Sequence, residues 1–281
     1  MTRDNGNAYI LPAAALLFFV TLYPVVYVVY LSLHRRLLIF DISRFVGLEN
    51  YFFLLRDDRF WNAFKNTAYF TALSVSLELI IGLSIAMLLS RSFRFKGIVR
   101  AIVLIPWAIP TVVSARMWEW IYNTDFGILN YLLGVKINWL GSPFWAMNAA
   151  VFMDVWKTTP FVAILLMAGL QVIPLELYQA ARVDGAGNWS IFRRITLPLL
   201  MPVILVVLIF RTLDAFRVFD AVYVLTGGGP ANTTETLSIY AYKVLFQTLQ
   251  FGYGSTLSVV VFLCTGAISV FYIRLLSRGV K

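Results

Sequence analysis

Charged side chains lie inside the apolar stretches 147–170 and 199–225 of this sequence. Asp154 and Lys157 lie in the stretch 147–170, and four more charges follow one another in the stretch 199–225. These four are Arg211, Asp214, Arg217 and Asp220. A charge in an apolar environment is costly unless it is paired or used, so these side chains are candidates for ligand binding or proton transfer.

A structural interpretation of the same charges remains open. The four charges in 199–225 alternate in sign at three-residue intervals, and residues three apart on a helix are neighbours. They can therefore neutralise one another along a single helix and hold the bundle together. We interpret Arg217 and Asp220 as the more structural pair, and Asp154 as structural.

The sequence contains few residues suited to catalysis or metal binding. His34 is the single histidine and Cys264 the single cysteine, which leaves no cysteine/histidine metal cluster and no nucleophile–base pair. We expect His34 to be solvated and Cys264 to be a packing residue. The run Gly227–Pro230 lacks the Lys-Ser/Thr of a phosphate-binding loop and is interpreted as a turn. The sequence therefore predicts no ATP hydrolysis by this chain itself.

The composition is that of a membrane protein. Hydrophobic residues make up 60% of the 281 residues and charged residues 13%, whereas soluble domains average about 45–50% and roughly 25%. The mean hydropathy is +0.79. The net charge of +9 comes without zinc-finger spacing or an arginine-rich aromatic platform, so it does not indicate nucleic-acid binding. The first apolar run, 8–33, is too long for the core of a cleavable signal peptide, and we expect it to be retained.

Six stretches are long and apolar enough to cross a membrane as helices. They predict an all-α membrane protein with a single transmembrane domain over residues 1–281. The expected spans are 9–33, 66–90, 98–121, 147–170, 199–225 and 255–276. Pro106 and Pro110 remove backbone donors from the third span and should kink it.

The basic residues predict the orientation. With the N-terminus inside, the segment 91–100 faces the cytoplasm with four basic residues and no acid. The opposite loop, 34–65, mixes arginines with acids such as Asp41 and Asp57. The better topology therefore places both termini inside.

The cytoplasmic segment 171–198 predicts a short amphipathic helix at about 175–188. Pro174 suits a helix start, and Gly185 and Gly187 suit its stop, because glycine accepts the left-handed conformation found there. Such a helix is suited to dock into a groove on a partner protein.

This segment resembles the signature of ATP-binding-cassette importer permeases, which is Glu-Ala-Ala, three residues, Gly, nine residues, Ile, one residue, Leu-Pro. Here Gln179-Ala180-Ala181 is followed by Gly185, then Ile195 and Leu197-Pro198 at the same spacing. Only the first position departs, with Gln179 in place of glutamate. The departure removes a charge that could contact the ATPase, and leaves the role of Gln179 itself open.

Further segments resemble the sugar-importing members of that family. These are Phe45–Tyr51, Phe60–Thr67, Leu225–Pro230, Thr234–Leu237 and Phe251–Gly254. They are similar to the maltose-type branch and to the first of its two permeases. The runs Trp156–Phe161 and Arg211–Arg217 look closest to the trehalose/maltose permeases of actinobacteria.

The resemblance implies a type I importer permease, multi-pass in the bacterial inner membrane. Its partners would be a second homologous permease, a dimer of ATPase subunits that bind ATP and Mg, membrane lipid, and an external sugar-binding protein. Transport would follow alternating access, driven by ATP binding to the ATPase dimer.

The residues that the resemblance implies as contacts to the ATPase are Tyr178, Gln179, Ala180, Ala181, Asp184, Gly185 and Ala186. The sugar contacts carried over are Trp156, Lys157, Thr158, Phe161, Arg211, Asp214, Ala215 and Val218; Trp156 and Phe161 could equally be packing residues.

An ion-coupled secondary transporter is the alternative, with Asp154, Asp214 and Asp220 as proton carriers. The six spans show no obvious inverted repeat, and that reading gives no reason for the signature at 179–198. A membrane-embedded enzyme ranks third. The sequence does not identify the sugar.

Overall fold

The computed structural model describes residues 5–91 and 93–279. The elements in the first part of the chain are α1 (Asn5–Ser32), β1 (His34–Leu37), β2 (Ile42–Phe45), α2 (Glu49–Leu55), α3 (Asp58–Ser90), α4 (Lys96–Ala108), α5 (Thr111–Ile121) and α6 (Ile128–Leu133). Those in the second part are α7 (Pro143–Val172), α8 (Leu175–Val183), α9 (Asn188–Ile191), α10 (Leu197–Phe216), α11 (Asp220–Thr226), α12 (Leu237–Tyr242) and α13 (Phe251–Gly279). Two π-helical turns, Phe192–Thr196 and Lys243–Gln247, follow α9 and α12. The predicted helical fold is confirmed in this coarse form.

Five described helices have the length and apolar character of membrane spans. A sixth span results if α4 and α5, which are bent by 94° at their junction, are counted together. Ile109, the residue before Pro110, is extended, as a residue that precedes proline prefers to be, and this ends the α4 helix. The kink expected in the third span is thus a near right angle at the α4–α5 junction, whereas Pro106 stays inside α4.

The expected fifth span, 199–225, also needs correction. Helix α10 ends at Phe216, and a new helix begins at Asp220 after three non-helical residues. Arg217 Nε donates a hydrogen bond to the Leu213 carbonyl at 3.1 Å. This contact satisfies a carbonyl that the last turn of a helix leaves without an amide partner. Arg211 and Asp214 therefore lie within the last turns of α10, whereas Arg217 and Asp220 lie beyond its end.

The chain packs into two compact units. The first unit comprises residues 1–61 and 237–263, and the second comprises 62–236 and 264–281. The single domain expected over 1–281 stays a prediction.

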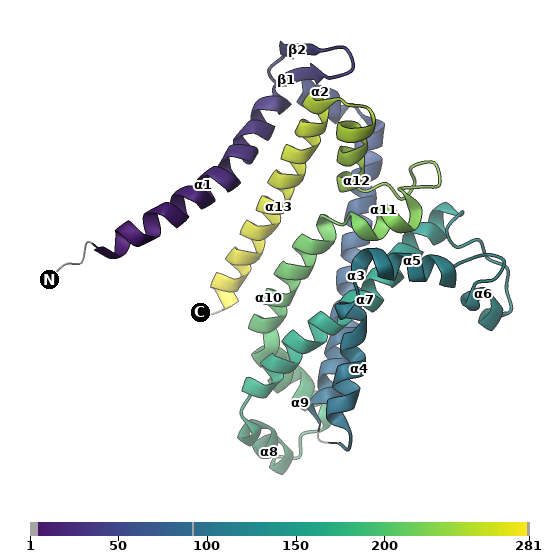
Figure 1. Cartoon of the computed structure of the whole chain (residues 1–281). Coiled ribbons are helices and arrows are strands. Elements are labelled where there is room, and N and C mark those ends of the chain that lie inside the picture. The colour runs from purple at the N-terminus through teal and green to yellow at the C-terminus, as the bar shows by residue number, and fades with distance from the viewer. Residues whose placement is uncertain (1–4, 92, 280–281) are drawn as a thin grey trace. The chain divides into compact units, whose positions relative to one another are not determined.

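In the first unit, the hairpin β1–β2 connects α1 to α2 and lies beside the start of α13 (Figure 1). The Asn50 amide donates to the carbonyls of Ser32 at 2.8 Å and His34 at 3.0 Å, which ties α2 to the end of α1. A Cβ at Gly252 would lie 2.0 Å from the His34 carbonyl oxygen, so the chain needs glycine at this close approach. The hydroxyls of Tyr240 and Tyr253 both donate to Asp57 Oδ2.

In the second unit, α3, α7 and α10 pack around a core of small and branched apolar side chains. This core contains Ala86, Val162, Leu166, Leu200, Ile204 and Val207. Gly82 lets α3 approach α7, because a Cβ there would lie 2.6 Å from Val162 Cγ1. Gly169 does the same between α7 and α10, with Leu200 Cδ1 at 2.8 Å. Small residues at helix contacts are typical of membrane bundles, whose helices associate by close packing.

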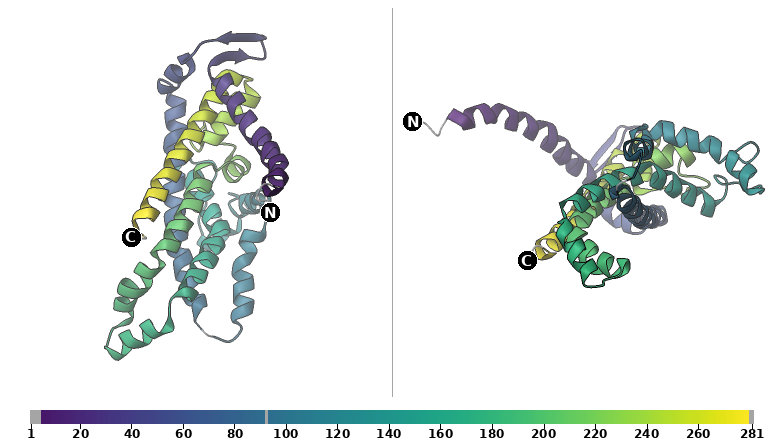
Figure 2. Two further views of the ribbon diagram at one scale, coloured as in Figure 1. Left: turned by 90° about the vertical axis from the view of Figure 1, so that its left-hand side faces the viewer. Right: turned by 90° about the horizontal axis from the view of Figure 1, so that it is seen from below.

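Helix α8 follows α7 directly and lies at the end of α7 and α10 (Figures 1 and 2). None of its side chains is buried. The second unit thus combines a packed bundle of long helices with one short, uncovered helix at its end.

Candidate functional site

A buried ion cluster centred on Arg211 joins three helices of the second unit. The Arg211 guanidinium donates from Nε to Glu78 Oε2 at 2.5 Å and from Nη2 to Glu78 Oε1 at 2.8 Å. Its Nη2 also donates to Asp154 Oδ2 at 3.1 Å, and its Nη1 donates to Asp214 Oδ2 at 2.5 Å. Arg211 therefore ties α3 and α7 to its own helix, α10, and one cation serves three carboxylates.

Sequence reasoning missed Glu78 as a member of this cluster. Its side chain is 0% exposed, and besides the two bonds from Arg211 it accepts one from Thr158 Oγ1 at 2.6 Å. The signal that could have found it is present in the sequence, because Glu78 is an acid in the middle of the otherwise uncharged stretch 66–90. Acids inside apolar spans are rare and are usually paired, so Glu78 calls for a basic partner.

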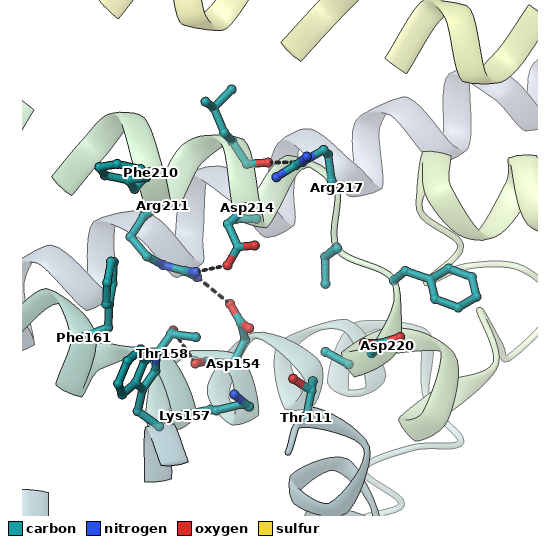
Figure 3. A pocket seen from close by; sticks show the side chains of 16 residues that line it. Thr111, Asp154, Lys157, Thr158, Phe161, Phe210, Arg211, Asp214, Arg217 and Asp220 are labelled. Atoms are coloured by element: carbon teal, nitrogen blue, oxygen red, sulfur yellow. Dashed lines mark hydrogen bonds and ion pairs between the residues drawn. The ribbon is translucent and has the colours of Figure 1, made fainter. Parts of the chain in front are cut away.

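A cavity of about 560 Å³ lies beside this cluster (Figure 3). It is lined by residues of α4, α5, α7, α10 and α11 and by the break between α10 and α11. Its polar lining is Thr111, Asp154, Lys157, Thr158, Arg211, Asp214, Arg217 and Asp220. Trp107 and Phe161 stack with ring centroids 5.7 Å apart and form part of its apolar lining. The cavity thus offers charged groups of both signs and an aromatic surface.

Seven of the eight sugar contacts expected from the resemblance line this cavity. They are Lys157, Thr158, Phe161, Arg211, Asp214, Ala215 and Val218. Lys157 makes no hydrogen bond or ion pair with the residues that the structure describes. The other oxygen of the Asp214 carboxylate, Oδ1, likewise has no partner among them. These two groups are a free donor and a free acceptor at the cavity wall.

Trp156 is the eighth of these residues and lies elsewhere. It lines a second cavity of about 660 Å³ that is almost wholly apolar, and it packs edge-on against Trp118 at 5.6 Å between ring centroids. The helical period explains the separation. Positions 154, 157, 158 and 161 share the polar side of α7, whereas 152, 155, 156, 159 and 160 share the apolar side.

The structural roles predicted from the sequence for Arg217, Asp220 and Asp154 differ from what the structure shows. Arg217 and Asp220 lie on either side of the helix break, both line the cavity, and no ion pair joins them within the described part of the chain. Their expected pairing along one helix is therefore wrong, because the helix does not continue between them. Asp154 has both a structural contact, to Arg211, and a place in the cavity wall.

The segment expected to contact an ATPase forms a helix followed by a tight turn. Helix α8 ends at Val183, and Gly185 adopts φ +78°, the left-handed conformation that favours glycine. The Ala186 amide donates back to the Ala181 carbonyl at 2.9 Å, which closes the turn. Gly187 does not share this conformation, and at φ −70° it begins α9 instead.

The exposed surface of this segment includes four of the seven expected contact residues. Gln179, Ala180, Asp184 and Gly185 are exposed, as are the apolar side chains of Leu175 and Val183. Ala181 and Ala186 are half-buried, and the Tyr178 hydroxyl lies 3.2 Å from Thr196 Oγ1, which anchors α8 to the turn before α10. Apolar side chains left uncovered on a short helix are typical of a docking surface.

Metal binding has no support in this arrangement. Across residues 5–91 and 93–279, no group of three or more His, Cys, Asp or Glu side chains could hold a metal ion.

A bundle of apolar helices with a charged cavity and an uncovered helix at its end has the features of a membrane transport permease. The chain belongs to the family described as the binding-protein-dependent transport system inner membrane component, whose family model matches residues 78–281. It is accordingly a multi-pass inner-membrane protein.

Curated relatives match nearly the whole chain. It is 45% identical to the trehalose/maltose transport system permease protein MalF of Thermococcus litoralis, over 96% of this chain and 92% of the relative. It is 42% identical to the trehalose transport system permease protein SugA of Mycobacterium tuberculosis, over 94% of this chain and 86% of the relative. It is also 40% identical to the sulfoquinovosyl glycerol transport system permease protein SmoG of Agrobacterium fabrum, over 94% and 88% respectively.

Solved structures show the same fold. A chain of a bacterial transporter involved in the import of alginate superposes with a TM-score of 0.85 at 23% identity, covering 99% of this chain and 97% of that one. An inward-facing methionine transporter chain gives a TM-score of 0.61 at 20% identity, covering 83% and 99%.

Proposed function

We propose that this chain is the first of two permease subunits in an ATP-driven importer that takes up a disaccharide such as trehalose or maltose. The observation that carries the proposal is the cavity beside Arg211, where a free Lys157 ammonium, a free Asp214 oxygen and the Trp107–Phe161 stack line one space. Sugars present hydroxyls that need donors and acceptors, and C–H faces that pack on aromatic rings. The relatives named for trehalose and maltose transport support this choice of substrate.

The surface around α8 and Gly185 is the proposed docking site for a separate ATPase subunit, which binds ATP and Mg. This assignment rests on the exposed helix, its tight turn and the family to which the chain belongs. A second permease would close the open side of the cavity, and an external binding protein would deliver the sugar. In this arrangement both termini face the cytoplasm, as the basic residues of 91–100 favour.

Alternating access then follows from differential binding. ATP binds more tightly to the state in which the ATPase dimer is closed, and the movement reaches the permease through α8. The long helices of the second unit carry the movement to the cavity, which opens to the outside to accept the sugar.

The test is ATP hydrolysis by the reconstituted complex of both permeases and the ATPase, with and without the binding protein. Trehalose, maltose and glucose would be supplied in turn, and uptake of each labelled sugar measured in the same vesicles. The expected result is ATP hydrolysis stimulated by the binding protein loaded with one disaccharide, together with uptake of that sugar. Uptake that needs no ATPase subunit and follows a proton gradient would overturn the proposal in favour of an ion-coupled secondary transporter.

A further inference from the structure

The Arg211 guanidinium has almost no hydrogen-bonding capacity left for a substrate. It carries five N–H donors, and its four hydrogen bonds to carboxylates engage four of them. Its side chain is 4% exposed. Arg211 therefore acts on the cavity through the carboxylates that it holds.

Of these carboxylates, Asp214 is the most exposed. Its side chain is 67% exposed, compared with 11% for Asp154 and 0% for Glu78. Its side chain lines the cavity; one of its oxygens accepts from Arg211, and the other has no partner among the described residues. An exposed carboxylate near a helix end normally samples several rotamers, so the bond from Arg211 selects one of them.

The orientation of Arg211 is in turn set from behind by Glu78. The two parallel bonds between them define the plane of the guanidinium, a geometry that a single bond does not fix. Thr158 on α7 donates to the same carboxylate, so Glu78 is itself held on two sides.

We propose that Glu78 is a positioning residue for the cavity: it fixes Arg211, and through Arg211 it orients the Asp214 carboxylate toward the sugar. Glu78 touches no substrate. Because Asp214 is already held in one orientation, it loses little conformational entropy when the sugar binds. A preorganised site therefore binds its ligand more tightly. This inference rests on the proposed function of the cavity.

Glu78 can be substituted without leaving the buried Arg211 charge unpaired, so the inference can be tested in a folded protein. Three carboxylates share one guanidinium, so Glu78→Gln still leaves Arg211 with Asp154 and Asp214 as partners. The glutamine keeps the size of the side chain but offers only one oxygen, so the two parallel charge-assisted bonds are lost. Glu78→Asp keeps the charge but is one methylene shorter, so it cannot reach both nitrogens in the same place.

The experiment measures sugar uptake and ATP hydrolysis in the same vesicles for the wild-type complex and for the Glu78→Gln and Glu78→Asp variants. In Glu78→Gln, uptake per ATP should fall about tenfold, the factor expected when a charge-assisted hydrogen bond is lost, while ATP hydrolysis stimulated by the binding protein persists. Glu78→Asp should show a clear part of that loss. As a matched control, Asp125→Asn removes a carboxylate from the exposed pair with Lys136, neither of which lines the cavity, and should change neither quantity.

Full recovery of uptake per ATP in Glu78→Asp would overturn the inference, because charge alone would then suffice. A parallel fall of uptake and ATP hydrolysis, in proportion to the amount of assembled complex, would also overturn it and assign Glu78 to stability alone. If the wild-type complex imports no sugar, the proposed function fails, and a structure of the Glu78→Gln complex decides the inference separately. A displaced Asp214 carboxylate in an otherwise unchanged bundle would support the positioning role, and an unmoved one would contradict it.

Discussion

Glu78 and Arg211 form a bidentate ion pair in the interior of the helix bundle, although 133 residues separate them in the chain. Nε and Nη2 of the guanidinium each donate to one oxygen of the carboxylate. Neither side chain is more than 4% exposed. The pair joins α3 to α10 directly at the wall of the cavity, so one contact serves both the packing of the bundle and the geometry of the site.

Replacement of Arg211 by methionine should strongly destabilise the second unit. The change leaves Glu78 buried without a cation, and breaking a buried ion pair costs about 3–5 kcal/mol. We expect little assembled complex and a lower melting temperature, measured by size-exclusion chromatography and thermal unfolding in detergent. Arg211→Lys should be intermediate, because an ammonium group cannot make the two parallel bonds. A methionine variant as stable as the wild type would contradict the role given to this pair.

Phe161 and Trp156 should respond differently to truncation, although they are five residues apart on α7. Phe161→Ala removes the ring that stacks on Trp107 in the polar cavity and should lower uptake per ATP. Trp156→Ala enlarges the apolar cavity and should lower the free energy of unfolding by about 1–3 kcal/mol, with uptake per ATP unchanged. Thermal unfolding and vesicle uptake distinguish the two effects. Equal losses of uptake per ATP in both variants would refute the separation of the two faces.

Gly185 and Gly187 provide a matched pair at the proposed ATPase docking site. A Cβ at either position would meet nothing within 4 Å, so the two differ mainly in backbone conformation, φ +78° against φ −70°. Gly185→Val should therefore strain the turn by roughly 1–2 kcal/mol and reduce stimulated ATP hydrolysis. Gly187→Val should have a smaller effect on the same assay. The assignment of the turn fails if the order of the two effects is reversed.

The β-hairpin of the first unit contains two arginines directly opposite each other, Arg35 and Arg44. Like charges at such positions repel, whereas opposite charges attract. Arg44→Glu should stabilise the hairpin by about 0.5 kcal/mol, seen as slower amide hydrogen exchange over residues 34–45. Arg44→Gln, which removes the repulsion without adding attraction, should give a smaller gain. High salt should reduce both effects, since both side chains are at the surface.

Alkaline pH should weaken the packing around Tyr240 in the first unit. Burial raises the pKa of Tyr240, and its hydrogen bond to Asp57 raises that pKa further. The fold therefore favours the neutral phenol: this stability is fully present below the ordinary tyrosine pKa of about 10 and declines as the pH rises above it. Thermal unfolding across the alkaline range should show this decline. Tyr240→Phe, which cannot ionise, should show a shallower one, and an identical slope would contradict the assignment.

The sequence alone determined the features that depend on neighbouring residues. The mean hydropathy of each stretch predicts the helices of the bundle, because a backbone in lipid must satisfy its hydrogen bonds within the helix. The spacing from Gln179 to Pro198 identifies the family, and the left-handed Gly185 follows from the need of a helix stop. The resemblance to sugar permeases selected Lys157, Phe161 and Asp214 as cavity residues, but it selected Trp156 with them, and Trp156 lines the other cavity.

Tertiary structure alone decided the contacts between distant segments. Glu78 shows in the sequence as a lone acid in an apolar stretch, but its partner lies on another helix and is chosen by packing. The helical period separates Trp156 from the polar side of α7, but the partner that packs against it, Trp118 of α5, is decided by the tertiary structure. The helix break after Phe216 puts Arg217 and Asp220 at the cavity instead of in an ion pair with each other. In each case, burial and pairing between segments that are distant in the chain stabilise the observed arrangement. The local composition would be the same if the side chains were arranged differently.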